Sequence, residues 1–221
     1  MTRFLSLAFR LTVAIAGLWG VVALAAGRVD AWGPLAWAAV IWVCAVTTHA
    51  AMLRLSPELL QERIAPPSDR DLATRRLVAL PMLGHLVLAG LDLRFGWSHV
   101  PLTAQLFGLT LVAAGFTLVA WTLLSNPFAS SAVRVQTERS HRVISTGPYG
   151  VVRHPMYLAV LMVSLGSGPG FGSWWAGLAM VPVVAAFLRR TLLEDQMLRD
   201  ELDGYGAYSE RVRWRVVPGV F

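Results

Sequence analysis

The residues best suited to chemistry lie in one polar stretch, residues 145–157, between two long apolar runs. Pro155 suits the first turn of a helix because its missing N–H would be unbonded there anyway. His154 would then be the N-cap, with Arg153 just before it and Tyr157 within the first helical turn. The stretch thus predicts cationic, titratable and phenolic groups at a helix N-terminus, which itself favours negative charge. A plain helix start with interfacial Arg and Tyr anchors is the alternative interpretation.

A second polar stretch, residues 189–198, follows the last apolar run. Arg190 and Glu194 are four residues apart and therefore share one face of the predicted helix, and Asp195 directly follows Glu194. An exposed pair of this kind contributes only about 0.3–0.5 kcal/mol and is common at helix ends. From spacing alone, an ordinary surface ion pair and a pair of functional residues are equally compatible with this stretch.

The composition places the chain in the membrane class. Of its 221 residues, 56% are hydrophobic and 14% are charged, whereas a soluble domain carries about a quarter charged residues. The net charge is +6 and every basic residue is Arg. Because these Arg residues lie between apolar runs, they indicate membrane topology, and no nucleic-acid partner is predicted. The single Cys44 lies within an apolar run, where packing is its favoured role, and no metal site is predicted.

The apolar runs predict an all-α fold, a polytopic membrane helix bundle with about six transmembrane helices in a single domain, residues 1–221. Four N-terminal spans in residues 1–124 precede residues 125–221, which carry both polar stretches. The last two spans are predicted to form a hairpin, with its turn in the Gly-rich segment 166–172. The predicted spans are residues 4–26, 32–53, 77–93, 101–124, 156–165 and 174–193.

Polar residues also lie in the loops and spans outside these stretches. Residues 55–76 form a polar loop, for which an interfacial segment and a lid are both compatible readings. In the connection between the fourth and fifth spans, residues 132–136 alternate like a short strand, and 142–144 could be another extended piece. Inside the third span, His85 is interpreted as structural, since buried polar groups are usually hydrogen-bonded, and Asp92 as a partner of the nearby Arg94.

The distribution of Arg predicts the orientation in the membrane. In a six-span topology every Arg except Arg28 and Arg94 falls on one side, which the positive-inside rule assigns to the cytoplasm. Both termini would then be cytoplasmic, as would the two polar stretches. A tight hairpin between the helices that carry these stretches would also make them neighbours.

Taken in order, the motifs between about residues 126 and 218 resemble those of the isoprenylcysteine carboxyl methyltransferase and phospholipid methyltransferase family. Its members are integral membrane enzymes that use S-adenosylmethionine. The shared pattern is a Gly-x-Tyr turn, Arg-His-Pro-x-Tyr, a helical hairpin, an acidic pair, Tyr-x-x-Tyr and Arg-Val. This chain departs from it at Asp195, where the family usually has Glu, and in the shorter spacing to Tyr205. The ordered set, more than any one motif, carries the resemblance.

The resemblance implies a role for each matching residue. Arg190 corresponds to an Arg implicated in handling the substrate or the transferred methyl, with Glu194 orienting the donor, so these two are the catalytic candidates. The segment 141–144 matches an adenosine-binding strand, and Gln136 is a looser match. The implied cofactor contacts are Gln136, His141, Arg142, Val143, Ile144, Tyr149, His154, Pro155, Met156, Tyr157, Glu194 and Asp195.

The family implies that a lipophilic acceptor enters from the bilayer, while S-adenosylmethionine arrives from the cytoplasm. A carboxylate acceptor would need no general base and could pair with Arg190, whereas an amine would need a proton acceptor such as Glu194, Asp195 or His154. The C-terminal Tyr205 and Tyr208 are predicted to anchor the tail on the membrane surface. The absence of Lys suggests a bacterial protein of the cytoplasmic membrane. Two other interpretations stay open, an NADPH-dependent membrane reductase of the sterol-reductase type and a non-catalytic membrane interaction protein.

Overall fold

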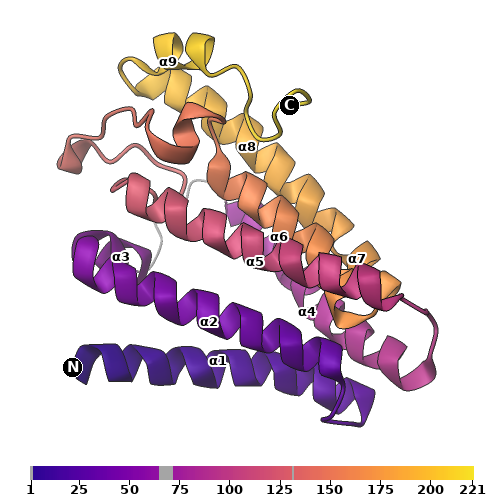
Figure 1. Ribbon diagram of the computed structural model, residues 1–221. Coiled ribbons are helices and arrows are strands. Elements are labelled where there is room, and N and C mark those ends of the chain that lie inside the picture. Colours follow the sequence, from indigo (N-terminus) through magenta and orange to yellow (C-terminus); the bar gives the residue numbers. More distant parts are fainter. Residues whose placement is uncertain (1, 65–71, 131) are drawn as a thin grey trace.

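The computed structural model describes residues 2–64, 72–130 and 132–221 (Figure 1). Within these residues it is helical, with no strand, which confirms the predicted all-α fold class. The long helices are α1 (Thr2–Ala26), α2 (Trp32–Leu55), α4 (Leu72–Phe95), α5 (Leu102–Ser125), α6 (Pro155–Phe171) and α8 (Val181–Glu201). The short elements are α3 (Pro57–Ile64), α7 (Trp174–Ala179), α9 (Tyr205–Arg211) and the 3₁₀ turns η1 (Thr137–Arg139) and η2 (Gly147–Gly150).

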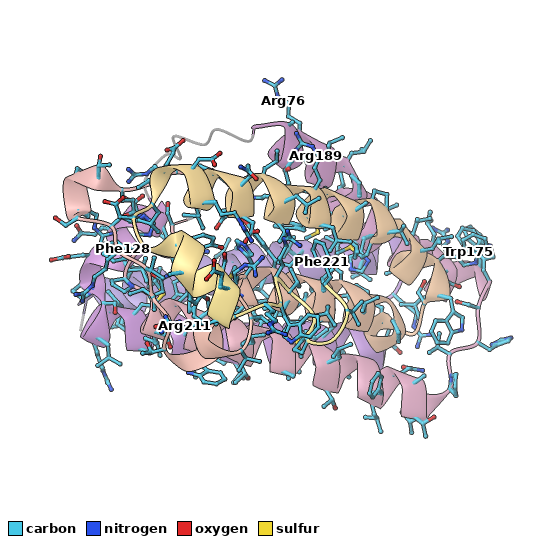
Figure 2. All side chains as sticks on the ribbon, turned by 90° about the horizontal axis from the view of Figure 1, so that it is seen from above. Arg76, Phe128, Trp175, Arg189, Arg211 and Phe221 are labelled. Atoms are coloured by element: carbon cyan, nitrogen blue, oxygen red, sulfur yellow. The ribbon has the colours of Figure 1, made fainter. Side chains whose placement is uncertain are left out.

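The long helices run back and forth along one bundle, so that α3, the connection between α5 and α6, and α9 lie toward the same end (Figure 1). Seen from above, Phe128 lies near that end and Trp175 at the other (Figure 2). Five segments are long and apolar enough to cross a membrane, namely Phe4–Ala26, Trp32–Leu55, Arg76–Phe95, Leu102–Ser125 and Trp174–Glu201. The apolar α6 is shorter, at 17 residues. The chain is therefore a polytopic helical membrane protein.

The predicted loop at 55–76 is partly helical. Pro57 begins α3, as expected for a residue that needs no N–H bond in a first turn, and α4 begins at Leu72, five residues before the predicted span. The remainder, residues 65–71, lies outside the described residues, so the choice between interfacial segment and lid stays a prediction. Met52 of α2 packs with Leu59 and Leu60 of α3, which places α3 against the bundle end.

The prediction that residues 166–172 form a hairpin turn was wrong, because α6 continues through most of them. A Cβ added at Gly108 of α5 would lie 2.6 Å from the carbonyl oxygen of Gly166, so these glycines let two helix backbones approach closely. The helix ends only at Gly172, whose φ of 84° and N–H bonds to Gly168 and Pro169 form a left-handed C-cap. The same residue types that mark turns in water thus serve as a packing surface here.

The sixth predicted span, residues 174–193, is two helices. The chain breaks at Met180, just before Pro182, whose ring disfavours an unbroken helix through this point. The second piece, α8, then extends to Glu201, so Arg190, Glu194 and Asp195 lie well inside a helix and not at its end. Their position along a continuous helix keeps Arg190 and Glu194 on one face, as predicted.

The polar residues of the third span have structural partners. The Nδ1 atom of His85 lies 2.9 Å from the carbonyl oxygen of Ala176, which supports the structural interpretation of this buried ring. Asp92 accepts hydrogen bonds from the backbone N–H of Ser98 and from the Ser173 hydroxyl, at 2.8 and 2.5 Å. These bonds tie the ends of α4 and α7 together, and Asp92 thus has partners other than the predicted Arg94.

The two predicted extended pieces between α5 and α6 form no strand in the described residues. Residues 132–136 and 141–145 run as irregular backbone around η1. The sequence predicted extended pieces there, but a strand needs a ladder partner, and no strand is found among the described residues.

Candidate active site

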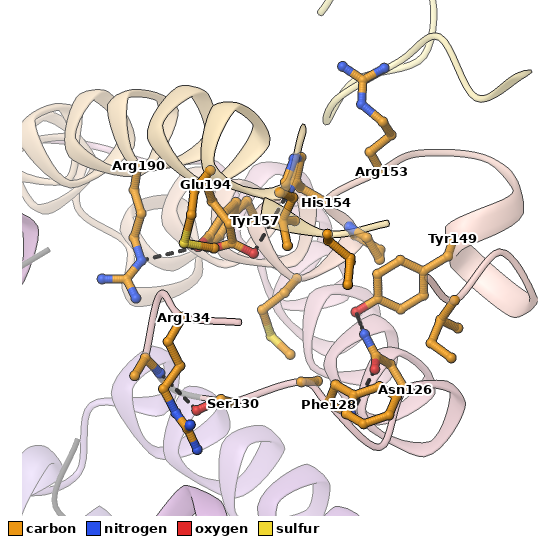
Figure 3. A pocket seen from close by; sticks show the side chains of 18 of the residues that line it. Asn126, Phe128, Ser130, Arg134, Tyr149, Arg153, His154, Tyr157, Arg190 and Glu194 are labelled. Carbon is orange, nitrogen blue, oxygen red and sulfur yellow. Dashed lines mark hydrogen bonds and ion pairs between the residues drawn. The ribbon is translucent and has the colours of Figure 1, made fainter. Parts of the chain in front are cut away.

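A cavity of about 560 Å³ lies at the end of the bundle that carries both polar stretches (Figure 3). Its walls come from α3, α4, α6, α8, α9 and the connection between α5 and α6. The predicted site residues that line it are His141, Arg142, Val143, Ile144, Tyr149, His154, Pro155, Met156, Tyr157, Arg190 and Glu194. The fold therefore brings the two stretches together, while Gln136 and Asp195, both described residues, do not line the cavity.

Tyr157 joins the two catalytic candidates. Its hydroxyl donates a hydrogen bond to Glu194 Oε2 and accepts one from Arg190 Nε at 3.1 Å. Tyr157 and Arg190 are buried, whereas 26% of the Glu194 side chain is exposed. The phenol thus bridges Arg190 and Glu194, which the sequence placed on one helix face, and the partly exposed Glu194 lines the cavity (Figure 3).

His154 is the N-cap of α6, as predicted, and Pro155 is the first helical residue. The backbone N–H of His154 donates to the Arg215 carbonyl at 2.8 Å, so the C-terminal tail fixes the start of the helix. Its ring stacks on Tyr157, with centroids 5.7 Å apart and planes 16° apart. Nδ1 of the ring lies 3.8 Å from Glu194 Oε1, beyond hydrogen-bond distance. The imidazole is therefore held by stacking on Tyr157 and by a 3.2 Å contact of Nε2 with Asp195 Oδ1, beside Glu194 at the cavity wall.

Asp195 turns away from the cavity toward the C-terminal segment. It is 2% exposed, and both of its oxygens bind Arg153, at 2.8 and 3.0 Å. The Tyr205 hydroxyl donates to Asp195 Oδ1 at 2.9 Å. Arg153 also donates to the carbonyl oxygens of Val212 and Arg213, at 2.8 and 2.9 Å. The adjacent acids therefore differ in place, since Glu194 faces the cavity and Asp195 joins α6, α8 and the tail.

Gln136 does not line the cavity, but its hydrogen bonds hold the loop that does. It is fully buried, with Nε2 donating to the Phe128 carbonyl and Oε1 accepting from Arg139, both at 2.7 Å. The His141 ring stacks on Phe128, with centroids 4.6 Å apart, and its Nδ1 accepts from the Gln136 N–H at 3.3 Å. Burial, and then the neighbouring Arg134 and Arg139, lower the pKa of His141. The ring is thus neutral near pH 7, as an acceptor at Nδ1 requires.

Tyr149 closes another side of the cavity. Its hydroxyl accepts a hydrogen bond from Asn126 Nδ2 at 2.9 Å, and its carbonyl accepts one from the Tyr208 hydroxyl at 2.8 Å. Burial raises the pKa of the Tyr149 phenol well above its usual range, so the group stays neutral. Tyr149 can therefore supply an aromatic surface and a neutral hydroxyl, but no phenolate.

Two residues predicted to lie on the membrane surface are buried in this site. Tyr205 and Tyr208 are 3% and 2% exposed and both line the cavity. The prediction of surface anchors was wrong because an aromatic residue near an interface can equally fill a cavity wall. Burial raises the pKa of Tyr208 to about 12, so its hydroxyl remains a donor.

A brace from α3, which the sequence did not indicate, supports the lining loop. Glu62 accepts from Arg134 at 2.9 Å and from the Ser130 hydroxyl at 3.0 Å. Arg63 donates to the Ala129 carbonyl at 2.9 Å. The hydrogen bond from Arg134 lowers the pKa of Glu62. Glu62 and Arg63 are visible in the sequence as charged residues of the 55–76 loop, but their partners some 70 residues away are not.

The remaining wall is apolar. Val78 and Ala79 of α4, Val160 of α6 and Phe187 of α8 line the cavity here, and the Phe187 ring lies 5.6 Å from the Tyr157 ring. A polar end and an apolar side in one cavity suit a ligand with a charged group and a hydrocarbon part. Among the described residues, no group of three or more His, Cys, Asp or Glu is placed to hold a metal ion.

Fold and site together define a helical membrane protein with an amphipathic cavity at one end of its bundle. Residues 103–203 match the model of the phospholipid methyltransferase family, which confirms the resemblance indicated by the motifs. The match covers most of α5 through α8, and the lining residues from α4 and α9 lie outside it. No curated protein and no solved structure matches the chain.

Proposed function

We propose that this protein is an integral membrane methyltransferase that moves a methyl group from S-adenosylmethionine to a lipophilic acceptor. The observation that carries the proposal is the Arg190–Tyr157–Glu194 cluster, which lies in one cavity lined by both motif stretches. The family match over residues 103–203 supports the methyltransferase class. The cofactor itself is inferred from that class and from the residues present.

The lining residues fit S-adenosylmethionine. A volume of about 560 Å³ is within the usual range of small-molecule sites, about 300–1,000 Å³. The partly exposed Glu194 can accept hydrogen bonds from an ammonium group or from ribose hydroxyls. The backbone of residues 141–144 borders the cavity without strand pairing, which leaves its groups able to bond an adenine edge. Bound there, the cofactor would supply an electrophilic methyl group.

The role of the protein in such a transfer is to align the reactants and exclude water. The stacked rings of His154 and Tyr157 provide a rigid wall, and Glu194 is oriented by the Tyr157 hydroxyl. Arg190 reaches the same hydroxyl from one turn earlier on α8. We therefore assign cofactor binding to Glu194 with His154, and acceptor positioning to Arg190.

The charge of the cavity favours an acidic acceptor. Of its described lining residues, Arg63, Arg142 and Arg190 are cationic and Glu194 is acidic, while Arg134 and Arg153 are paired with Glu62 and Asp195. A site with this balance attracts an anion and repels a protonated amine. A carboxylate on a lipid-like molecule, of the isoprenylcysteine type, would also need no general base. Its hydrocarbon part would lie along Val78 and Phe187.

We also propose that the cavity faces the cytoplasm, with both termini on that side of a bacterial cytoplasmic membrane. The arginine distribution supports this orientation, because loop Arg residues concentrate on the cytoplasmic side. The division into residues 1–124 and 125–221 remains a prediction, with the cofactor region in the second part. Cysteine introduced at Arg142 should react with an impermeant thiol reagent only when the membrane is opened.

The test is calorimetric binding of S-adenosylmethionine to the purified full-length protein in detergent. Binding should be weakened strongly by His154→Ala and Glu194→Ala. The matched controls are His99→Ala and Glu210→Ala, since both residues are exposed and outside the cavity lining. They should bind as the parent does.

No binding by a folded parent would refute the proposal. NADPH binding in its place would indicate the reductase alternative, and binding of neither cofactor would indicate a non-catalytic interaction protein. With binding established, methyl transfer to a lipophilic carboxylate should exceed transfer to the matching amide and amine.

A further inference from the structure

Asp195 is surrounded by hydrogen-bond donors. Its Oδ1 lies 2.8 Å from Arg153 Nε, 2.9 Å from the Tyr205 hydroxyl and 3.2 Å from His154 Nε2. Its Oδ2 contacts three guanidinium groups, those of Arg153, Arg215 and Arg199, at 3.0, 3.1 and 3.4 Å. With three arginines against one carboxylate, Asp195 is held as an anion that only accepts hydrogen bonds.

This arrangement decides which nitrogen of His154 carries the proton. An ionised carboxylate cannot donate, so a hydrogen bond between Asp195 Oδ1 and His154 Nε2 requires the proton on Nε2. The Tyr205 oxygen, 3.4 Å from Nε2, is compatible because its own proton is directed to Asp195. In the neutral ring Nδ1 is then unprotonated. This atom lies on the side of Glu194, at the cavity wall.

We propose that Asp195 is a positioning residue that fixes His154 in its Nε2–H form, so that Nδ1 presents a hydrogen-bond acceptor to the bound ligand. The acceptor, beside the Glu194 carboxylate, suits an ammonium group or a hydroxyl, the donors that S-adenosylmethionine carries on its amino-acid and ribose parts. Asp195 thus acts through His154 and touches no ligand. The ligand assignment rests on the proposed function, whereas the proton position does not.

The variant Asp195→Asn tests whether Asp195 sets the position of the His154 proton, because an amide offers one acceptor and one donor in place of two acceptors. Its NH₂ group cannot face the Oδ2 position, where three guanidinium groups donate and none can accept. At the Oδ1 position it would meet one guanidinium donor, Arg153 Nε, together with Tyr205 and His154, both of which can become acceptors. We therefore expect the amide to place NH₂ toward His154, which moves the ring proton from Nε2 to Nδ1.

The readout is ¹⁵N NMR of histidine-labelled full-length protein without ligand, with the His154 signals assigned by their loss in His154→Asn. The parent should show the proton on Nε2, and Asp195→Asn should show it on Nδ1. The binding constant for S-adenosylmethionine should weaken by about 10- to 150-fold, the loss of one hydrogen bond to a charged group. The control Asp200→Asn, an exposed acid on the same helix, should change neither.

Each outcome decides the proposal. A proton on Nδ1, or on both nitrogens, in the parent overturns it, and this measurement needs no folded variant. Weaker binding by Asp195→Asn with an unchanged tautomer also overturns it, since Asp195 would then act only through stability. A tautomer shift in a protein whose parent binds no S-adenosylmethionine would uphold the positioning role and refute the proposed function.

Discussion

Replacing Tyr157 by Phe tests the site most directly, because it removes one oxygen and keeps the ring. The stacking on His154 and the tilted contact with Phe187 should survive, since both involve the ring. What disappears is the hydroxyl that donates to Glu194 and accepts from Arg190. The variant therefore separates the orientation of the two charged groups from the packing of the cavity wall.

The magnitude follows from the charge of the partners. A hydrogen bond to a charged group contributes about 1.5–3 kcal/mol, against about 0.5–1.5 kcal/mol for a neutral pair. We expect Tyr157→Phe to weaken S-adenosylmethionine binding by about 10- to 150-fold. The matched variant Tyr149→Phe loses a neutral hydrogen bond with Asn126, so its effect should stay below about 12-fold.

The assay is calorimetry in detergent on parent, Tyr157→Phe, Tyr149→Phe and Glu194→Ala, with thermal unfolding as a check of the fold. If Tyr157→Phe binds within about threefold of the parent while Glu194→Ala binds poorly, the hydroxyl does not orient Glu194. That result would refute the reasoning and leave Glu194 as an independent contact. Equal losses in both tyrosine variants would instead point to general damage of the cavity.

Three further results are expected. Glu62→Gln removes a partly exposed charge pair with Arg134, so cofactor affinity should fall by up to about fivefold at low salt and by less at high salt. A loss that salt does not change would contradict an electrostatic role of this pair. Because burial lowers the pKa of His141 in the folded protein, the contribution of this residue to the free energy of unfolding should be full above about pH 6.5 and decline as the pH falls below it. If the unfolding temperature of His141→Gln declines with falling pH as much as that of the parent, His141 is not the cause. Gly108→Ala should destabilise the protein by about 1–3 kcal/mol through the clash with the facing helix backbone, whereas Gly17→Ala, which meets nothing within 4 Å, should not; equal unfolding temperatures would count against the close packing.

The composition and the apolar runs were sufficient to predict the class of fold. A helix that crosses a membrane must satisfy its backbone internally, so a long apolar run leaves few alternatives to a spanning helix. The start of α6 was also predictable, because Pro155 restricts the first turn and makes His154 its N-cap. The ordered motifs also indicated a resemblance to the phospholipid methyltransferase family, and the match of its model to residues 103–203 confirms that resemblance.

Turns and strands inside this class were less predictable. In the Gly-rich segment 166–172, local preference pointed to a turn, yet close packing against α5 favours continuation of the helix. Alternation in residues 132–136 pointed to a strand, but no partner strand exists among the described residues. Both errors have one cause, since a neighbouring element decides what a locally ambiguous segment becomes.

The sequence by itself determined that this chain crosses a membrane and that Arg190 and Glu194 share a helix face. Only the tertiary structure decided the different places of Glu194 and Asp195, adjacent residues whose directions from α8 differ by about 100°. One carboxylate reaches the cavity, and the other meets Arg153. That outcome depends on where α6 and the C-terminal tail pack around α8, which no local pattern encodes.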